Sequence, residues 1–156
     1  MTTEVKVIGG VILVTIIIFI GGIFFLSKSE ETVPEADVVS RNGLHWHPRL
    51  TVYIKGKKQE FTDNIGLGAV HQPMHTHVED YKSGVVHMEM QGVVAKDETK
   101  LGNFFRIWNK QFSSNTLFDE TNGSEGTVKM LVNGSESKDF ENYMMHDGDN
   151  IEIKYE

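Results

Sequence analysis

The sequence predicts an α+β domain, a mixed sheet with one amphipathic helix, preceded by a single transmembrane helix. Three observations lead to this fold class. Residues 7–26 are continuously apolar, residues 101–108 carry apolar side chains at helical spacing, and segments of alternating apolar residues lie before and after that helix. Strands, one helix and then more strands are the order of an α+β fold. An all-β sandwich is the alternative.

The apolar run from Val7 to Leu26 contains no charged residue and a single hydroxyl group, that of Thr15. A helix of about 20 apolar residues covers the roughly 30 Å hydrocarbon core of a bilayer. The run is too long for the apolar part of a signal peptide, and no Ala-x-Ala cleavage motif follows it. We therefore expect an uncleaved single-pass anchor in the cell membrane, with membrane lipid as its partner.

The anchor divides the chain into four parts. Residues 1–6 are a short cytoplasmic tail, 7–26 the transmembrane helix, 27–42 a polar and acidic linker, and 43–156 a globular domain. The linker contains Pro34 and shows no apolar periodicity. A short tail before a first hydrophobic helix favours the signal-anchor orientation, which places the globular domain outside the cytoplasm.

Charge and cysteine content exclude several classes of function. The chain has a net charge of −7, and residues 43–156 contain 12 basic and 17 acidic residues, so nucleic acid is not an expected partner. The absence of cysteine excludes disulfides and thiolate metal sites. Any metal must be held by nitrogen, oxygen or thioether ligands.

Two strand pairs are expected in the first half of the domain. Residues 50–54 alternate apolar and polar, 55–58 supply a turn, and 59–62 return, which is typical of a β-hairpin. Residues 74–78 and 85–90 form the second pair, joined by a polar loop.

The helix is expected where Leu101, Phe104, Phe105 and Trp108 repeat at i, i+3, i+4 and i+7. Thr99 is the candidate N-cap residue. The apolar face of this helix should pack against the sheet and contribute to the core.

The domain is expected to end in two strands. Residues 128–132 alternate up to the turn pair Asn133-Gly134, and residues 151–155 alternate again. The segments 132–134 and 147–151 resemble the closing strands of β-grasp domains. The resemblance implies a β-grasp-like sheet with the helix across one face.

Histidines are concentrated in one part of the chain. Six of the seven lie between His45 and His87, and two pairs have the spacing His-x-His, His45/His47 and His75/His77. Random placement would give only about 0.3 such pairs. This excess indicates a shared role for the histidines.

That role is expected to be metal binding. Alternate residues of a strand project from one face, so His75 and His77 can converge on one ion. His87, on the returning strand, can supply a third nitrogen and leave an open coordination position. His45 and His47 either complete this site or form a second one.

Copper is the expected metal, with zinc as the alternative, because imidazole suits both ions. Thioether sulfur favours copper, and Met74, Met88 and Met90 lie close in sequence to the histidines. Met74 and His71 are additional candidate ligands. Met88 and Met90 have the opposite strand parity to His87 and should face away from the site.

Two carboxylates, Asp80 and Glu89, are candidates to orient a ligand imidazole through its second nitrogen. The alternative for both is a solvated surface charge. For the histidines the alternative is ordinary hydrogen bonding, which is the preferred interpretation of His71 and His146.

Four motifs occur in this chain in a fixed order: His45-Trp46-His47-Pro48, His75-Thr76-His77, Gly84-Val85-Val86-His87-Met88-Glu89, and Leu101-Gly102-Asn103-Phe104-Phe105-x-x-Trp108. This order resembles a family of exported or membrane-anchored prokaryotic domains without an established activity. The resemblance implies a shared extracytoplasmic fold and a shared site at His75, His77 and His87. It implies no reaction.

The leading functional hypothesis is a membrane-anchored extracytoplasmic metal-binding module without enzymatic activity. It would carry or buffer an ion for a metal-trafficking partner, or serve as an accessory subunit of a membrane protein complex. The second hypothesis is a metalloenzyme with an open three-histidine site, and the third is a metal-free interaction domain. No nucleophile elbow or phosphate-binding loop indicates another reaction.

Overall fold

The structure is a computed structural model that describes residues 3–26 and 33–156. The chain forms two compact units, Met1–Thr32 and Val33–Glu156. The first two residues of the expected tail, and residues 27–32 of the expected linker, lie outside the described residues.

The first unit contains one helix, α1 (Thr3–Leu26). Within the described part of the chain, no helix has the length and hydrophobicity needed to cross a membrane. This finding contradicts the expected transmembrane helix over 7–26 and the single-pass membrane localisation inferred from it.

The second unit begins earlier in the sequence than residue 43. Strand β1 (Val38–Ser40) follows the short 3-10 helix η1 (Glu35–Asp37) and pairs antiparallel with β7 (Val94–Ala95). Residues 33–42 therefore belong to this unit, although their polar composition is that of a linker. A strand of three residues is too short to produce a readable apolar alternation.

The larger sheet has five strands in the order β11-β10-β12-β3-β4. The central pair, β12 and β3, is parallel, and the other pairs are antiparallel. The five strands are β3 (Arg49–Ile54), β4 (Lys57–Gln59), β10 (Val128–Val132), β11 (Ser135–Glu136) and β12 (Asn150–Tyr155). The mixed sheet and the α+β class are confirmed.

Both hairpins of this sheet turn through residues with positive φ. Lys55 and Gly56 have φ values of 49° and 76°, and Asn133 and Gly134 have values of 52° and 82°. Two consecutive positive φ angles are typical of the type I′ turn, whose twist matches that of the strands. These are the two turns expected from the sequence.

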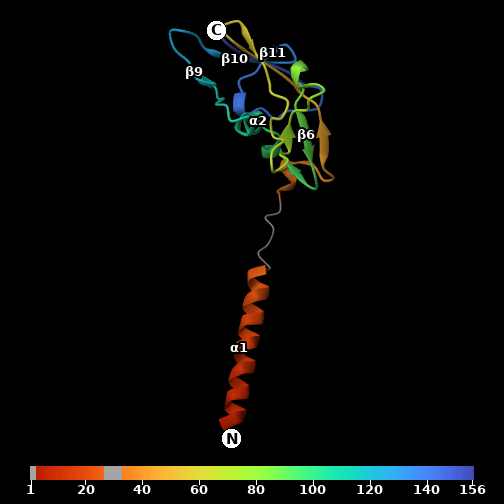
Figure 1. The fold of residues 1–156 in the computed structure, drawn as a ribbon, viewed down its shortest axis with the longest axis vertical. Helices are drawn as coiled ribbons and strands as arrows, with labels where there is room; N and C mark the ends of the chain where they lie inside the picture. Colours follow the sequence, from red (N-terminus) through yellow and green to blue (C-terminus); the bar gives the residue numbers. More distant parts are fainter. Residues whose placement is uncertain (1–2, 27–32) are drawn as a thin grey trace. The chain divides into compact units, whose positions relative to one another are not determined.

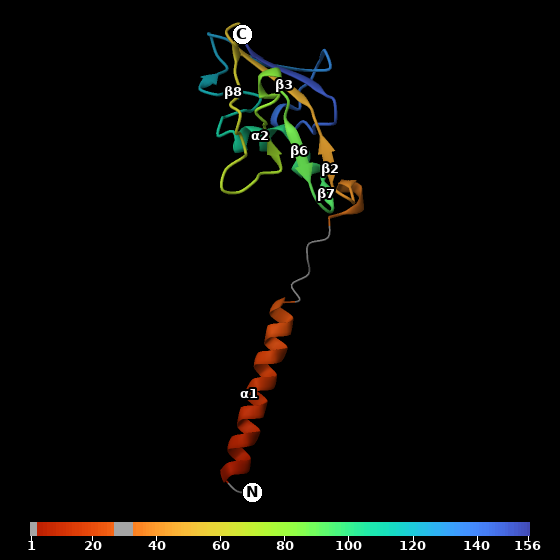
Figure 2. The same cartoon turned by 45° about the vertical axis from the view of Figure 1, so that its right-hand side comes forward.

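A second, three-stranded sheet has the order β2-β6-β5 and is antiparallel throughout. Its strands are β2 (Leu44–Trp46), β5 (Met74–His75) and β6 (His87–Met90). In both views β6 lies in the half of the second unit that is remote from the C-terminus (Figures 1 and 2). A further pair joins β8 (Thr116–Leu117) and β9 (Glu120–Thr121).

The chain passes directly from the smaller sheet into the larger one at Pro48. The backbone N–H of Val86 donates to the carbonyl of Pro48 (2.9 Å), and that of Leu50 donates to the carbonyl of Gly84 (2.8 Å). These two hydrogen bonds fix the segment before β6 against the start of β3. The position of the smaller sheet therefore depends on the larger one.

Helix α2 (Leu101–Ile107) contributes the apolar face that its spacing predicts. Leu101, Phe104 and Phe105 are fully buried in a core shared with both sheets. The expected N-cap was wrong: Lys100 occupies that position, and Thr99 lies in the 3-10 helix η3 (Lys96–Thr99), where its hydroxyl donates to the carbonyl of Lys96. Two further 3-10 helices are η2 (Tyr81–Ser83) and η4 (Phe140–Asn142).

Candidate metal centre

One face of the smaller sheet carries three of the histidines. In the antiparallel register His75 lies opposite His87, and His45 lies opposite Glu89. Residues that pair directly share a face, and residues two positions apart on a strand also share one. His45, His75, His87 and Glu89 therefore project from the same face of the sheet.

The methionines occupy the opposite face of the smaller sheet. Met74 pairs with Met88, and both side chains are fully buried in the hydrophobic core, as Met90 nearly is. Met74 is thus corrected from a candidate ligand to a core residue, because strand alternation turns it away from His75. The thioether argument for copper loses its structural basis for all three methionines.

His75 is the centre of the cluster. Its side chain is fully buried, and its Nε2 atom lies 3.0 Å from Nε2 of His77, 3.4 Å from Nε2 of His71 and 3.9 Å from Oε1 of Glu89. Ligand atoms that share a first-row metal ion at about 2.0–2.1 Å are separated by about 2.8–4.1 Å. The three distances around His75 fall in this range.

The backbone selects the tautomer of His75. The carbonyl oxygen of Gln72 lies 3.1 Å from Nδ1, so Nδ1–H donates to it and Nε2 keeps its lone pair toward the other histidines. Burial lowers the pKa of His75, and the neighbouring His71 and His77 lower it further against the opposing effects of Gln72 and Glu89. A neutral imidazole with an inward-facing lone pair is the form that binds metal.

His87 is held by a carboxylate. Its Nε2 lies 2.9 Å from Oδ2 of Asp80, which leaves Nδ1 as the nitrogen with a free lone pair. The other oxygen of that carboxylate, Oδ1, is buried and has no hydrogen-bond partner among the described residues. A buried carboxylate oxygen without a partner is costly unless positive charge lies nearby.

Four of these residues can converge on one point. Ligand atoms of His75, His77, His87 and Glu89 all lie within 4.8 Å of one another, and we call these residues the inner group. The rings of His77 and His87 are 4.4 Å apart between centroids. The structure thus brings together the three histidines expected to form the site, with Glu89 beside them.

His45 and His47 continue the cluster toward solvent, and we call them the outer group. Their ring centroids are 4.6 Å apart, and the ring of His47 lies 4.9 Å from that of His87. Ligand atoms of His45, His47 and His87 also lie within 4.8 Å of one another. Both outer side chains are exposed, at 61% and 43%, in contrast to buried His75.

His71 lies closer to the cluster than we expected from the sequence. His71 lies in a loop that turns back on itself, with Gln72 N–H donating to the carbonyl of Gly66 (2.9 Å), and this turn brings its ring to 4.4 Å from that of His75. Gly66 and Gly68 were the only local signal of such a turn. His146 is outside the cluster; its Nδ1 lies 3.6 Å from Oδ2 of Asp149.

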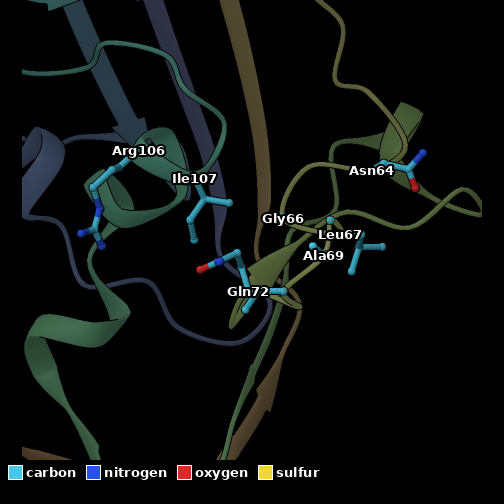
Figure 3. Close-up of a pocket in the computed structure, with 9 residues that line it drawn as sticks. Asn64, Gly66, Leu67, Ala69, Gln72, Arg106 and Ile107 are labelled. Atoms are coloured by element: carbon cyan, nitrogen blue, oxygen red, sulfur yellow. The ribbon is translucent and has the colours of Figure 1, made fainter.

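Two hollows of the second unit differ in their lining: histidines line the smaller one and not the larger. One, of about 630 Å³, lies between the loop after Asn64 and helix α2, with Arg106 as its only charged lining residue (Figure 3). The other, of about 580 Å³, is lined by His45, His71, Glu89 and Glu98 together with Leu44, Gln72, Pro73, Met90 and Gln91. The second hollow gives solvent a route to the cluster.

The chain matches no family model, and it has no significant match among curated proteins or solved structures. The resemblance to exported or membrane-anchored prokaryotic domains therefore stays a prediction. Function must be inferred from the geometry of the histidine cluster.

Acid is expected to destabilise the metal-free protein through His75. Because the pKa of His75 is lowered in the fold, the unfolded chain binds a proton more readily, and the free energy of unfolding should decrease as the pH falls below the ordinary value of 6.5. Above that value no such loss is expected. His75 is surrounded by other titratable groups, namely His71, His77, His87 and Glu89. Urea unfolding of the unmodified protein is therefore compared with that of a His75→Gln variant, each at about pH 7.5 and 5.5. An equal decrease in both proteins would contradict the assignment to His75.

A methyl group at Gly66 is expected to disturb the loop behind His75. Gly66 has a φ of +76°, and a Cβ atom would lie 2.4 Å from the carbonyl oxygen of Met74 and 3.0 Å from Cβ of His75. Gly66→Ala should lower the free energy of unfolding by at least about 1–2 kcal/mol and weaken metal binding. Gly68→Ala, where a Cβ atom meets nothing within 4 Å, is the matched control and should change stability by less than about 0.5 kcal/mol. Equal effects of the two substitutions in urea unfolding would refute the expectation.

Proposed function

We propose that this protein is a metal-binding module that holds a divalent transition-metal ion at the inner group. One observation carries the proposal: ligand atoms of His75, His77, His87 and Glu89 lie within 4.8 Å of one another around a fully buried imidazole. Three nitrogens and one carboxylate oxygen are a donor set that such ions accept.

The surroundings of the inner group support this proposal. Gln72 and Asp80 each engage one nitrogen of a histidine, which fixes the tautomers and leaves the other nitrogen for an ion. The unpartnered Oδ1 atom belongs to the Asp80 carboxylate that holds His87, and a cation bound by His87 would offset the negative charge of that carboxylate. In a metal-free role, the short His75–His77 contact would be an N–H···N hydrogen bond.

Copper(II) is the proposed ion, and zinc is the alternative. The core position of the methionines removes the sulfur ligands that Cu(I) would favour. An imidazole and carboxylate site suits Cu(II) and Zn(II), and Cu(II) binds more tightly to most sites of this kind. Because the outer histidines are exposed, the module is proposed to carry or buffer the ion.

A finer description of the fold accompanies this proposal. The strand order β11-β10-β12-β3-β4, with a parallel central pair and α2 between the two hairpins in sequence, supports a β-grasp-like arrangement of the larger sheet. The smaller sheet that carries the histidines would then be an addition inserted between β4 and α2, together with the strand β2 that precedes β3.

A metalloenzyme is the second candidate. The hollow of about 580 Å³ reaches His45, His71 and Glu89 and contains a further carboxylate, Glu98. An ion with an open coordination position can activate a water molecule, and a nearby carboxylate can accept its proton. Turnover of an activated ester by the metal-loaded protein, lost in Glu98→Gln without loss of the ion, would support this candidate over a carrier.

Equilibrium titration of the full chain with Cu(II) and Zn(II), against a chelator of known affinity, tests metal binding. Stoichiometric binding is expected in the unmodified protein, and it should be lost in the triple variant His75→Ala/His77→Ala/His87→Ala. His146→Ala is the matched control, because this histidine is exposed and lies outside the cluster. Binding no tighter in the unmodified protein than in the triple variant would leave a metal-free interaction domain.

Asp80 is expected to contribute to affinity without binding the ion directly. Asp80→Asn keeps the shape of the side chain but removes the charge that holds Nε2 of His87. Loss of such a partner raises the dissociation constant by about 10–100-fold. Asp119→Asn, at an exposed carboxylate between β8 and β9, should leave the constant unchanged. The same titration measures the dissociation constants of both variants. Equal constants for the two variants would show that Asp80 does not contribute to metal affinity.

A further inference from the structure

We infer that the histidine face binds two metal ions, an inner one and an outer one, with the Glu89 carboxylate between them. This inference rests on the proposed function and extends it to the number of ions and the residues that separate them. Two overlapping groups of candidate ligands occur on the same face, the inner group and the set His45, His47 and His87.

Glu89 lies between the two positions. Its Oε1 atom is 3.2 Å from Nε2 of His45 and 3.9 Å from Nε2 of His75. A carboxylate has two oxygens with several lone pairs, so it can bind one ion through each oxygen. Carboxylate-rich two-metal sites hold their ions about 3.5–4 Å apart, a separation that one bridging group can span.

His87 cannot bind both ions. Nε2 of His87 is engaged by Asp80, so only Nδ1 remains for an ion. Because His87 lies directly opposite His75 in the sheet, we assign its free nitrogen to the inner ion, and His45, His47 and Glu89 are then the proposed ligands of the outer one. The sheet register supports this division, because His45 lies directly opposite Glu89 and His75 directly opposite His87.

The charges around the cluster suit two cations. Three carboxylates contact its histidines: Asp80 contacts His87, Glu89 contacts His45, and Asp147 accepts a hydrogen bond from the backbone N–H of His47 (2.7 Å). Oδ1 of Asp147 also lies 3.7 Å from Nδ1 of that histidine. One divalent ion would leave a net negative charge among these groups, and a second ion offsets it.

The inner and outer positions differ in solvent exposure, and their affinities for the ion should differ for that reason. The inner position surrounds an imidazole with no exposed surface, whereas His45 is 61% exposed and adjoins the hollow of about 580 Å³. Solvent and competing ligands reach the outer ion more easily. The outer ion should therefore bind more weakly and exchange faster than the inner one.

The stoichiometry of Cu(II) binding to the full chain tests the inference. Titration followed by native mass spectrometry should give two equivalents, the second weaker than the first. The double variant His45→Ala/His47→Ala should bind one equivalent with the first affinity unchanged, and His146→Ala should still bind two. Because both outer histidines are exposed, loss of the fold is not expected, and circular dichroism checks this.

Electron paramagnetic resonance shows whether the two ions lie close to each other, which a measurement of affinity does not. The first equivalent of Cu(II) should give the spectrum of an isolated ion, and the second should reduce and broaden it through coupling over about 4 Å. One equivalent in the unmodified protein, two in the double variant, or two uncoupled ions would each overturn the inference and leave the proposed function intact. No binding at all would overturn both.

Discussion

Replacement of His75 by alanine is expected to lower the affinity of the full chain for Cu(II) by at least about 100-fold. Loss of a residue that only orients a ligand lowers metal affinity by about 10–100-fold, and loss of the ligand itself should lower it further. His75 is fully buried, and its Nε2 faces His71, His77 and Glu89 at 3.0–3.9 Å. Among the described histidines of the cluster, His75 is the one that is fully buried. Equilibrium titration measures the change.

The control for this prediction separates loss of a ligand from loss of the fold. His146→Ala removes an exposed histidine and should leave the affinity unchanged. The urea unfolding transition of each metal-free variant shows whether its domain is folded under the titration conditions. A folded His75→Ala protein that binds Cu(II) as tightly as the unmodified chain would contradict a site centred on His75.

The largest loss of stability is expected for Phe104→Ala. Phe104 is fully buried on α2, and its ring lies 5.7 Å from that of Phe61 and 6.0 Å from that of Trp108. Removal of a buried phenyl ring leaves a cavity and costs about 3–5 kcal/mol of unfolding free energy. Val93→Ala, at an exposed position, should cost less than about 0.5 kcal/mol. A difference below about 1 kcal/mol between the two variants in urea unfolding would show that α2 does not anchor the core.

Periodicity predicted those parts of the fold in which burial follows a regular repeat. Strands β3, β10 and β12 alternate in burial as they do in sequence, and the apolar spacing in α2 matches its buried face. The turn pair Asn133-Gly134 was readable because only a few residues adopt positive φ. Strand β1 was missed because three residues carry no measurable period.

The candidate site was predictable where strand geometry determines it. His-x-His spacing and an antiparallel return place His75 and His87 opposite each other, as the register shows. The parity of Met88 and Met90 was correct, whereas Met74 should have been excluded by the same rule. The proximity of His71 depends on a loop, and the proximity of the outer group depends on the pairing of β2 with β6. Neither leaves a local pattern in the sequence.

The expected membrane span shows a different limit. Hydropathy alone led to the anchor at 7–26 and to the localisation derived from it, and the described helices contradict both. The metal hypothesis did not depend on the anchor. It rests on residues 45–89, and the structure describes all of these.

Anomalous X-ray diffraction from crystals of the Cu(II)-loaded protein is the most direct test of the central claim. The proposed function predicts an anomalous peak at the copper edge about 2.0–2.1 Å from a nitrogen of each of His75, His77 and His87. A peak located only at other histidines, or the absence of any ordered copper in fully loaded crystals, would contradict it.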